Sequence, residues 1–278
     1  KGRESFIEYF REAMNESTNY RNWENAFKHF CNYAKGECCF DDITVEFCQG
    51  FLTHMLKLKT PSGGTMKAST ANNNFGKLIA VIRRAVAAGR LKDNIIPFLK
   101  PAKEEKTKKE FLTHEELKRL AATPCKHEVF KAASLFSCLT GLRISDIIAL
   151  RWENICEAPD GGWCLRLTTQ KTKTEATLPL SDEALRLCGE RGTGQVFKGM
   201  AKSLCPVYLK DWIAAAGITK HITFHCFRHT FATLQIASGT DIYTVSKMLT
   251  HTNVTTTQVY ADVVSELKRE AANKITLE

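Results

Sequence analysis

The sequence lacks the features that mark several well-known protein classes. No apolar run approaches the roughly 20 residues that a membrane-spanning helix needs, and no signal peptide is visible. The 11 cysteines are odd in number and scattered, and none forms a Cys-x-x-Cys pair. This pattern argues against a disulfide framework or a zinc ribbon. We therefore expect a protein of the reducing cytoplasm whose cysteines are ordinary buried thiols.

Acidic residues are also missing from one long window. Between Phe47 and Lys92 there is no Asp or Glu, although the whole chain contains 30 of them. A solvated surface normally mixes charge signs, so one-signed charge at this density favours binding to phosphates. The formal net charge of +9 also favours an acidic partner. We expect contacts with DNA or RNA from basic residues of this window, which include Lys57, Lys59, Lys67, Lys77, Arg83 and Arg84.

Apolar residues at helical spacing run through the first hundred residues, with few strand signals. The amides of Asn72, Asn73 and Asn74 allow two interpretations, a frayed first helical turn or a DNA-facing surface. The segment that follows this region is rich in Lys and Glu, which is typical of a linker. We expect helices at 5–14, 19–33, 44–58 and 68–90, a helical DNA-binding domain at 1–98, a linker at 99–110 and a second domain at 111–278.

The second domain opens with a capping box, in which Thr113 precedes Glu116 by three residues. Helical patterns continue to about residue 151 and resume from 181 to about 274. Between them lie three runs with strand character, at 152–156, 163–169 and 176–180. The chain is therefore predicted to be mainly α, with a small helical domain and a mostly helical domain that contains a small antiparallel sheet.

The stretch HCFRHTF at 225–231 places two histidines and an arginine on one helix face. His225, Arg228 and His229 stand at i, i+3 and i+4. A His-x-x-x-His pair can bind zinc, but here a permanent cation lies between the two histidines. An oxygen anion such as phosphate fits better, and we expect no metal or other cofactor.

Three further stretches have the same chemical character. Arg143 lies in a glycine-containing turn, with Asp146 three residues later. Lys171 and Lys173 occupy the tip of an expected hairpin. His251 is followed nine residues later by Tyr260. Each feature alone has an ordinary explanation, since a single tyrosine on a helix usually belongs to a core. Together they supply the groups that cleave a phosphodiester without metal, because arginines stabilise the phosphorane, a lysine protonates the leaving oxygen and a histidine deprotonates the nucleophile.

The order and spacing of these residues resemble those of the tyrosine recombinase (phage integrase) family over essentially the whole second domain. The matching stretches are Thr-Gly-Leu-Arg143-x-Ser-Asp, His225-x-x-Arg228-His229, Leu249-x-His251 and Tyr260. The first domain resembles the core-binding (SAM-like) domain of that family. The resemblance implies a site-specific DNA recombinase that forms a 3′-phosphotyrosine without metal or ATP. It would assemble as a tetramer on double-stranded DNA, for integration or excision of a mobile element.

The resemblance also implies a role for each matching residue. Lys171 suits the general acid of the family's hairpin, with Lys173 as the alternative. Asp146 would orient Arg143, and His229 would support the site by packing or hydrogen bonding beneath it. Thr250 departs from the glycine that usually precedes the third-motif histidine. The remaining roles are phosphate binding by Arg143 and Arg228, acid/base catalysis by His225, a hydrogen bond to phosphate from His251, and nucleophilic attack by Tyr260.

Other functions and partners remain open at this stage. A type IB topoisomerase uses a similar residue set as a monomer, and a DNA-binding regulator could retain a degenerate site. Residues 265–275 read as an amphipathic tail helix that would dock on a neighbouring subunit or pack on its own domain. The sequence begins at Lys1 without a methionine. This leaves room for a preceding arm-binding domain and for a host DNA-bending partner.

Overall fold

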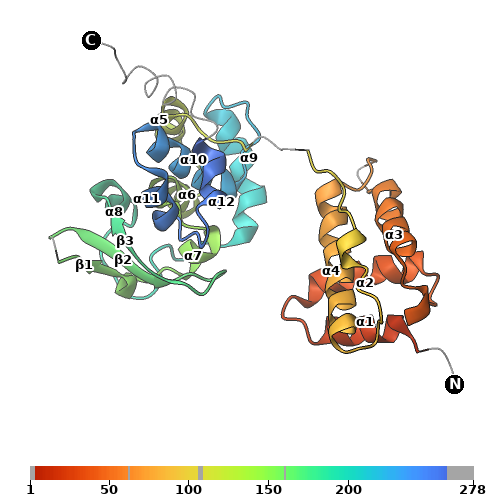
Figure 1. Cartoon of the computed structure of the whole chain (residues 1–278). Coiled ribbons are helices and arrows are strands. Elements are labelled where there is room, and N and C mark those ends of the chain that lie inside the picture. The colour runs from red at the N-terminus through yellow and green to blue at the C-terminus, as the bar shows by residue number, and fades with distance from the viewer. Residues whose placement is uncertain (1–3, 62, 106–108, 160, 262–278) are drawn as a thin grey trace, which may run out of the picture. The chain divides into compact units, whose positions relative to one another are not determined.

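The computed structural model describes residues 4–61, 63–105, 109–159 and 161–261 and divides the chain into two compact units (Figure 1). The first unit comprises residues 1–107 and the second residues 108–278. In the described residues, no helix is both long enough and apolar enough to cross a membrane.

The first unit consists of helices that pack around an aromatic core. Four phenylalanines at its centre are fully buried, namely Phe6, Phe10, Phe30 and Phe51. Their rings meet in tilted and edge-on arrangements, which aromatic pairs prefer over face-to-face stacking. Helix caps follow the sequence, since Ser5 and Thr44 each accept a hydrogen bond from the first turn of a helix. The elements are α1 (Phe6–Asn15), α2 (Tyr20–Tyr33), η1 (Phe40–Asp42), α3 (Val45–Lys57), α4 (Ala68–Ala87) and η2 (Ile96–Phe98).

Asn72 and Asn74 at the start of α4 form hydrogen bonds with backbone groups of the first unit. This differs from both sequence interpretations, a frayed helical turn and a DNA-facing surface. The side-chain amide of Asn72 donates to the carbonyl of Ala102 and accepts from its N–H, at 2.9 and 2.8 Å. Gln49 makes the same pair of bonds with Lys100. Asn74 is buried and donates to the carbonyl of Thr70 within its own helix. Two amides therefore bind the start of the expected linker to the first unit.

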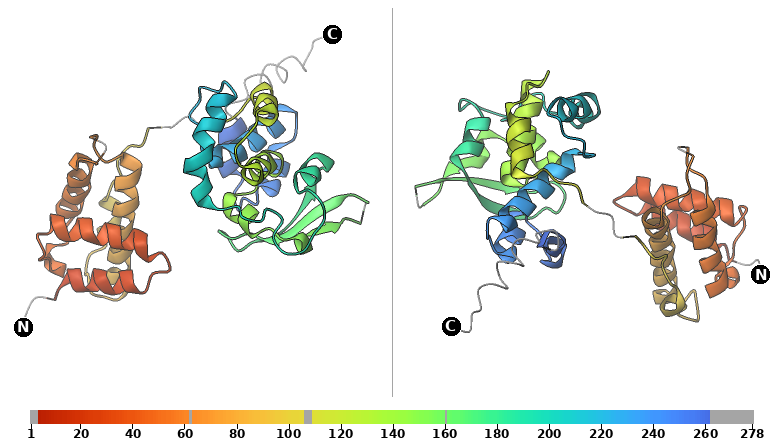
Figure 2. Two further views of the ribbon diagram at one scale, coloured as in Figure 1. Left: turned by 180° about the vertical axis from the view of Figure 1, so that it is seen from behind. Right: turned by 90° about the horizontal axis from the view of Figure 1, so that it is seen from above.

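The second unit contains eight α-helices and a three-stranded antiparallel sheet in its described residues (Figure 2). The strand order is β1-β2-β3, with Leu165 paired to Ile155 on one side and to Leu178 on the other. The elements are α5 (His114–Ala122), α6 (Glu128–Thr140), α7 (Ile144–Ala149), η3 (Trp152–Asn154), β1 (Ile155–Glu157), β2 (Trp163–Thr168), β3 (Glu175–Leu180), α8 (Asp182–Leu187), η4 (Lys202–Leu204), α9 (Cys205–Ala215), α10 (Phe224–Ala237), α11 (Ile242–Met248) and α12 (Thr255–Ala261).

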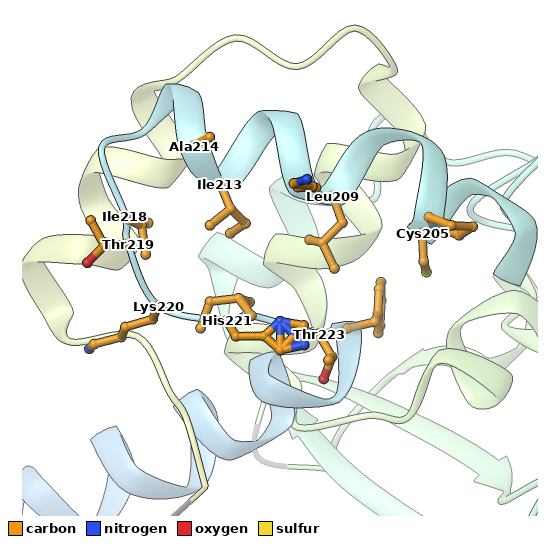
Figure 3. Close-up of a pocket in the computed structure, with 13 residues that line it drawn as sticks. Cys205, Leu209, Ile213, Ala214, Ile218, Thr219, Lys220, His221 and Thr223 are labelled. Atoms are coloured by element: carbon orange, nitrogen blue, oxygen red, sulfur yellow. The ribbon is translucent and has the colours of Figure 1, made fainter. Parts of the chain in front are cut away.

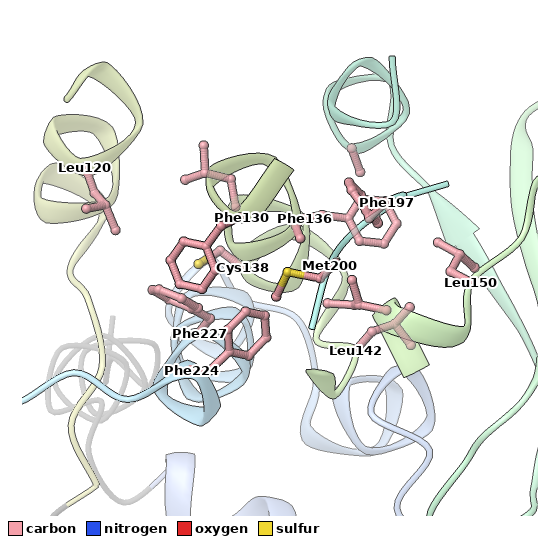
Figure 4. Close-up of a cluster of buried hydrophobic side chains, with 14 of the residues drawn as sticks. Leu120, Phe130, Phe136, Cys138, Leu142, Leu150, Phe197, Met200, Phe224 and Phe227 are labelled. Carbon is pink, nitrogen blue, oxygen red and sulfur yellow. The ribbon is translucent and has the colours of Figure 1, made fainter. Parts of the chain in front are cut away.

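Helices α6 and α10 form the centre of this unit. Figure 4 shows Phe130 from α6 beside Phe224 and Phe227 from α10, while Phe136 from α6 packs against Phe197, and all of these rings are buried. The aromatic face of α10 therefore packs into the core. Because these residues share one helix with His225 and Arg228, the core fixes the position of the charged face.

The predicted fold class is confirmed, and some predicted boundaries are wrong. The run at 152–156 begins with a 3-10 turn, because the side chain of Asn154 accepts from the N–H of Arg151, and the strand starts only at Ile155. The fourth helix stops at Ala87 instead of continuing to residue 90. The Thr113–Glu116 capping box is confirmed by its two reciprocal hydrogen bonds. The expected tail helix at 265–275 lies outside the described residues.

Gly141 ends α6 with a left-handed φ of +69° in a tightly packed place. A methyl group there would lie 2.6 Å from a ring carbon of Phe231 and 2.8 Å from a methyl carbon of Leu249. The backbone conformation alone costs a side-chain-bearing residue about 1–2 kcal/mol. The crowding adds about 1–3 kcal/mol, because a packed core resists extra volume.

We therefore expect Gly141→Ala to lower the urea midpoint of the second unit more than Gly217→Ala does. Gly217 is the matched control, because its φ is +68° and a methyl group there would meet nothing within 4 Å. Denaturation curves of the two variants and the parent separate crowding from backbone strain. Equal midpoints for the two variants would contradict the packing argument.

Candidate active site

The turn between α6 and α7 positions the first arginine of the site. Arg143 occupies the N-cap position of α7, two residues after the left-handed glycine that ends α6. One of its terminal nitrogens, Nη1, is buried and has no hydrogen-bond partner in the described part of the chain. A guanidinium with a buried, unused donor nitrogen is suited to an oxygen anion.

Asp146 does not act as its sequence position suggested. The structure has no hydrogen bond or ion pair between Asp146 and Arg143. Instead, the buried Asp146 accepts the backbone N–H of Gln170 at 2.7 Å through Oδ1. Gln170 directly precedes Lys171, so the carboxylate anchors the β2–β3 hairpin that carries the lysine. In the structure Asp146 therefore positions the hairpin and does not orient Arg143 as the sequence had suggested.

Arg228 lies at the centre of the site and is 2% exposed. Its Nη1 donates to the carbonyl of Gly141 at 2.6 Å, and its Nη2 donates to the carbonyl of Leu249. Burial, and then the charge of Arg143, lowers the pKa of Arg228 to about 10. The guanidinium therefore stays charged at neutral pH, and its two bonds join the turn of Arg143 to the loop of His251.

Residues of the Arg143 motif, the lysine hairpin and the His225–Arg228 motif line one cavity. It has a volume of about 180 Å³ and combines the α6–α7 turn, the hairpin and the start of α10. Lys173, at the hairpin tip with a left-handed φ of +53°, is not among the lining residues. The lining residues are Leu142, Arg143, Ile144, Ser145, Lys171, Phe224, His225 and Arg228.

The three histidines of the site are held neutral. Burial first, and then the charge of His225, lowers the pKa of His229 to about 3. Burial, followed by the charge of Arg228, lowers the pKa of His251 to about 4. Partial desolvation also lowers the pKa of His225, and the charges of Arg228, Arg143, Lys109 and Lys171 act in the same direction. The site is thus electropositive without the histidines being charged.

His251 and Tyr260 are positioned by the last two described helices. Nδ1 of His251 lies 2.8 Å from the hydroxyl of Thr257, which fixes the orientation of the ring. Thr250 adopts a left-handed φ of +54°, which explains why glycine suits this position. Tyr260 on α12 is 3% exposed, and its hydroxyl lies 2.8 Å from Nδ1 of His229. Tyr260 does not line the cavity described above.

Sequence reasoning missed one charged neighbour of the tyrosine. Lys109 belonged to the expected linker, but its Nζ lies 5.2 Å from the centre of the Tyr260 ring. Burial lowers the pKa of this lysine. No local sequence signal marks it, because its place depends on how the segment before α5 crosses the second unit.

The expected DNA-binding residues of the first unit fall into two groups. Arg84 makes a two-point ion pair with Glu16 and lies over the ring of Tyr9, so its guanidinium is already engaged within the unit. Lys77 lies over the ring of Trp23. The other four side chains are exposed, namely Lys57, Lys59, Lys67 and Arg83.

A larger groove of about 710 Å³ runs between α9 and residues 218–223 (Figure 3). Its walls are mostly apolar and include Leu209, Ile213 and Ile218. Lys220, at its edge, is already bonded to the carbonyl of Phe111 and to Glu116. Because few free polar groups converge there, the smaller cavity with its two arginines is the better candidate for chemistry.

The neutral histidines predict how stability depends on pH. Their pKa values are lower in the folded state than the ordinary 6.5, so below pH 6.5 the unfolded chain binds protons that the folded protein excludes. Each such histidine lowers the stability by up to about 1.4 kcal/mol per pH unit. We expect the urea midpoint of the second unit to fall from pH 6.5 to 5, and His229→Gln to flatten this slope. His221→Gln, a change at an exposed histidine, is the control, and equal slopes in both variants would contradict the assignment.

Comparisons with known proteins agree with this geometry. Residues 110–266 match the phage integrase family, and residues 5–107 match the phage integrase SAM-like domain. The chain is 24% identical to a tyrosine recombinase of Thermosipho africanus (strain TCF52B), over 98% of each chain. It is 26% identical to the tyrosine recombinase XerC of Bacillus licheniformis, over 95% of this chain and 92% of that one.

Solved structures share the fold at low sequence identity. The integrase of transposon Tn1549 in complex with circular-intermediate DNA superposes with a TM-score of 0.72 at 16% identity, covering 98% of this chain and 100% of that one. A lambda integrase dimer bound to a COC′ core site gives a TM-score of 0.71 at 18% identity, covering 100% and 81%. With a family match over more than half of its length, the chain belongs to the phage integrase (tyrosine recombinase) family and is a tyrosine-type site-specific recombinase that acts on DNA.

Proposed function

We propose that the chain cleaves and rejoins DNA through a covalent 3′-phosphotyrosine formed by Tyr260, without metal or ATP. The observation that carries this proposal is the cavity that unites Arg143, Lys171, His225 and Arg228 from three separate segments. Such a set neutralises a phosphate, stabilises the charge that develops on it and protonates a leaving oxygen.

The arginines and histidines would divide the work at the phosphate. Arg143 offers the unused donor of its buried Nη1, while Arg228 adds fixed charge because two backbone carbonyls hold it. His225 lines the cavity, where it would act in proton transfer. His251, oriented through Nδ1 by Thr257, would use its other ring nitrogen on a phosphate oxygen.

Lys171 is the favoured general acid, in preference to Lys173. Lys171 lines the cavity, and its charge is one of those that lower the pKa of His225. The bond from Gln170 to Asp146 holds the loop of the hairpin beside α7. Lys173, two residues further along, is better suited to contact the DNA backbone.

Binding and assembly follow from the same hypothesis. The exposed cations Lys57, Lys59, Lys67 and Arg83 would contact the DNA backbone. A lambda integrase has been solved as a tetramer bound to a Holliday junction. By analogy this chain would form a tetramer on its recombination site in the cytoplasm, assisted where needed by a host DNA-bending protein. Integration or excision of a mobile element is the proposed outcome.

The nucleophile can be tested directly with Tyr260→Phe. The protein is incubated in EDTA with supercoiled plasmids that carry the DNA flanking its coding sequence, and the reaction is stopped with SDS. We expect protein attached to a DNA 3′ end with the parent and none with the variant, because the attacking oxygen is gone. Tyr243→Phe, a change at an exposed tyrosine on α11, is the control. Adducts with Tyr260→Phe would identify another nucleophile, and no adduct with the parent would refute the proposed function.

The general acid can be tested on a duplex that spans the mapped cleavage position. Lys171→Ala should slow cleavage by about 10²–10⁴-fold, because the leaving 5′ oxygen loses its proton donor. A 5′-bridging sulfur leaves without that proton, so a phosphorothiolate duplex should restore the rate. Lys173→Ala should weaken binding without this rescue. The reverse pattern would assign the general acid to Lys173.

A further inference from the structure

The hydroxyl of the proposed nucleophile is already paired with a histidine that the cavity does not include. Nδ1 of His229 lies 2.8 Å from the oxygen of Tyr260, and it is the one hydrogen-bond partner of that oxygen among the described residues. Both side chains are buried, at 8% and 3% exposure, so water competes poorly for the bond. The ring of His229 also packs edge-on against that of His225, with centroids 4.6 Å apart.

We propose that His229 is a catalytic residue that accepts the phenolic proton of Tyr260 as the tyrosine attacks the scissile phosphate. This inference rests on the proposed function and deepens it. It moves the deprotonation of the nucleophile from His225, which lines the phosphate cavity, to the second histidine of the same helix.

A proton acceptor is needed because burial raises the pKa of Tyr260 above its usual value. At neutral pH the tyrosine is therefore a neutral phenol and a weak nucleophile. Nδ1 of His251 is occupied by Thr257. His229 is neutral in the free protein, and in the tautomer with a proton on Nε2 its Nδ1 lone pair points to the hydroxyl.

The charges around His229 make its basicity depend on DNA. Arg228 from its own helix and Lys109 from the segment before α5 add their charges to burial, and protonation of His225 would act in the same direction, so the pKa of His229 is lowered to about 3. A phosphate bound between Arg143, His225 and Arg228 would offset these cations and raise that pKa. The tyrosine would then be activated only when DNA occupies the cavity.

The step balances without any further reactant. The O–H bond of Tyr260 breaks and its proton moves to Nδ1 of His229, while the phenolic oxygen forms a bond to phosphorus. The bond from phosphorus to the 5′ oxygen breaks, and that oxygen takes a proton from Lys171. Religation reverses each transfer. Lys109, 5.2 Å from the tyrosine ring, acts as a positioning residue whose charge favours the developing phenolate.

The test uses His229→Asn on the duplex that spans the mapped cleavage position. The asparagine amide can keep a hydrogen bond to Tyr260 but cannot accept its proton. If His229 only positioned the tyrosine, the variant would therefore cleave nearly as fast as the parent. We expect cleavage to slow by about 10²–10⁴-fold with DNA binding unchanged. The rate of the variant should rise with pH up to the ionisation of the phenol, whereas the parent should level off near neutrality. His221→Asn, the same change at an exposed histidine lining the apolar groove, is the control.

A sulfur leaving group separates this role from that of Lys171. The phosphorothiolate duplex should leave His229→Asn slow, because the defect lies in the nucleophile, while it restores Lys171→Ala. Cleavage by His229→Asn within about threefold of the parent, or rescue by the sulfur duplex, would overturn the inference. A parent that forms no adduct would instead refute the proposed function itself.

A measurement on the parent covers the case in which the variant does not fold. Imidazole ¹⁵N NMR follows the protonation of His229 during a pH titration, with and without sulfate as a stand-in for the phosphate anion. Tyr260→Phe identifies the nitrogen that receives the hydrogen bond. We expect sulfate to move the protonation of His229 to higher pH. An unchanged titration, or an Nδ1 that carries the proton throughout, would overturn the inference.

Discussion

The catalytic unit depends on the two hydrogen bonds that the buried guanidinium of Arg228 donates to backbone carbonyls. They join Gly141, at the end of α6, to Leu249, at the end of α11. Arg143 lies two residues beyond the first carbonyl and His251 two residues beyond the second. A side chain that is 2% exposed thus sets the spacing of the other phosphate-facing groups. Since a planar fork with several donors is required, lysine could not replace it.

Burying this cation has consequences for every titratable neighbour. Its charge, added to that of Arg143 and to desolvation, keeps the site histidines neutral and the cavity electropositive. A phosphate entering the cavity supplies the missing negative charge and changes the protonation of the groups around it. The resting protein therefore holds its tyrosine as a hydrogen-bonded phenol beside a weak base, and substrate binding itself supplies the electrostatic conditions for attack.

Polar and charged side chains that do not themselves line the phosphate-facing turn hold several other parts of this site in place. Asp146 anchors the lysine hairpin through the N–H of Gln170, and Thr257 orients His251. Lys109, from the segment that enters the unit, lies over the nucleophile. In the other unit Gln49 and Asn72 hold the segment that leaves it. Side-chain amides that bind backbone groups thereby hold the segment where it leaves the first unit, and a cation–π contact holds it where it enters the second.

The sequence by itself determined the fold class, the family and the composition of the cavity. Apolar spacing places Phe224 and Phe227 in the core and so turns His225 and Arg228 toward the site, because helical periodicity is local. Only the tertiary structure decided the pairings. Asp146 stands three residues after Arg143 yet bonds to Gln170, and Lys109 reaches Tyr260 from 151 positions away. Such contacts depend on how separate segments pack and on which buried polar atoms need a partner, and no spacing within one segment encodes that.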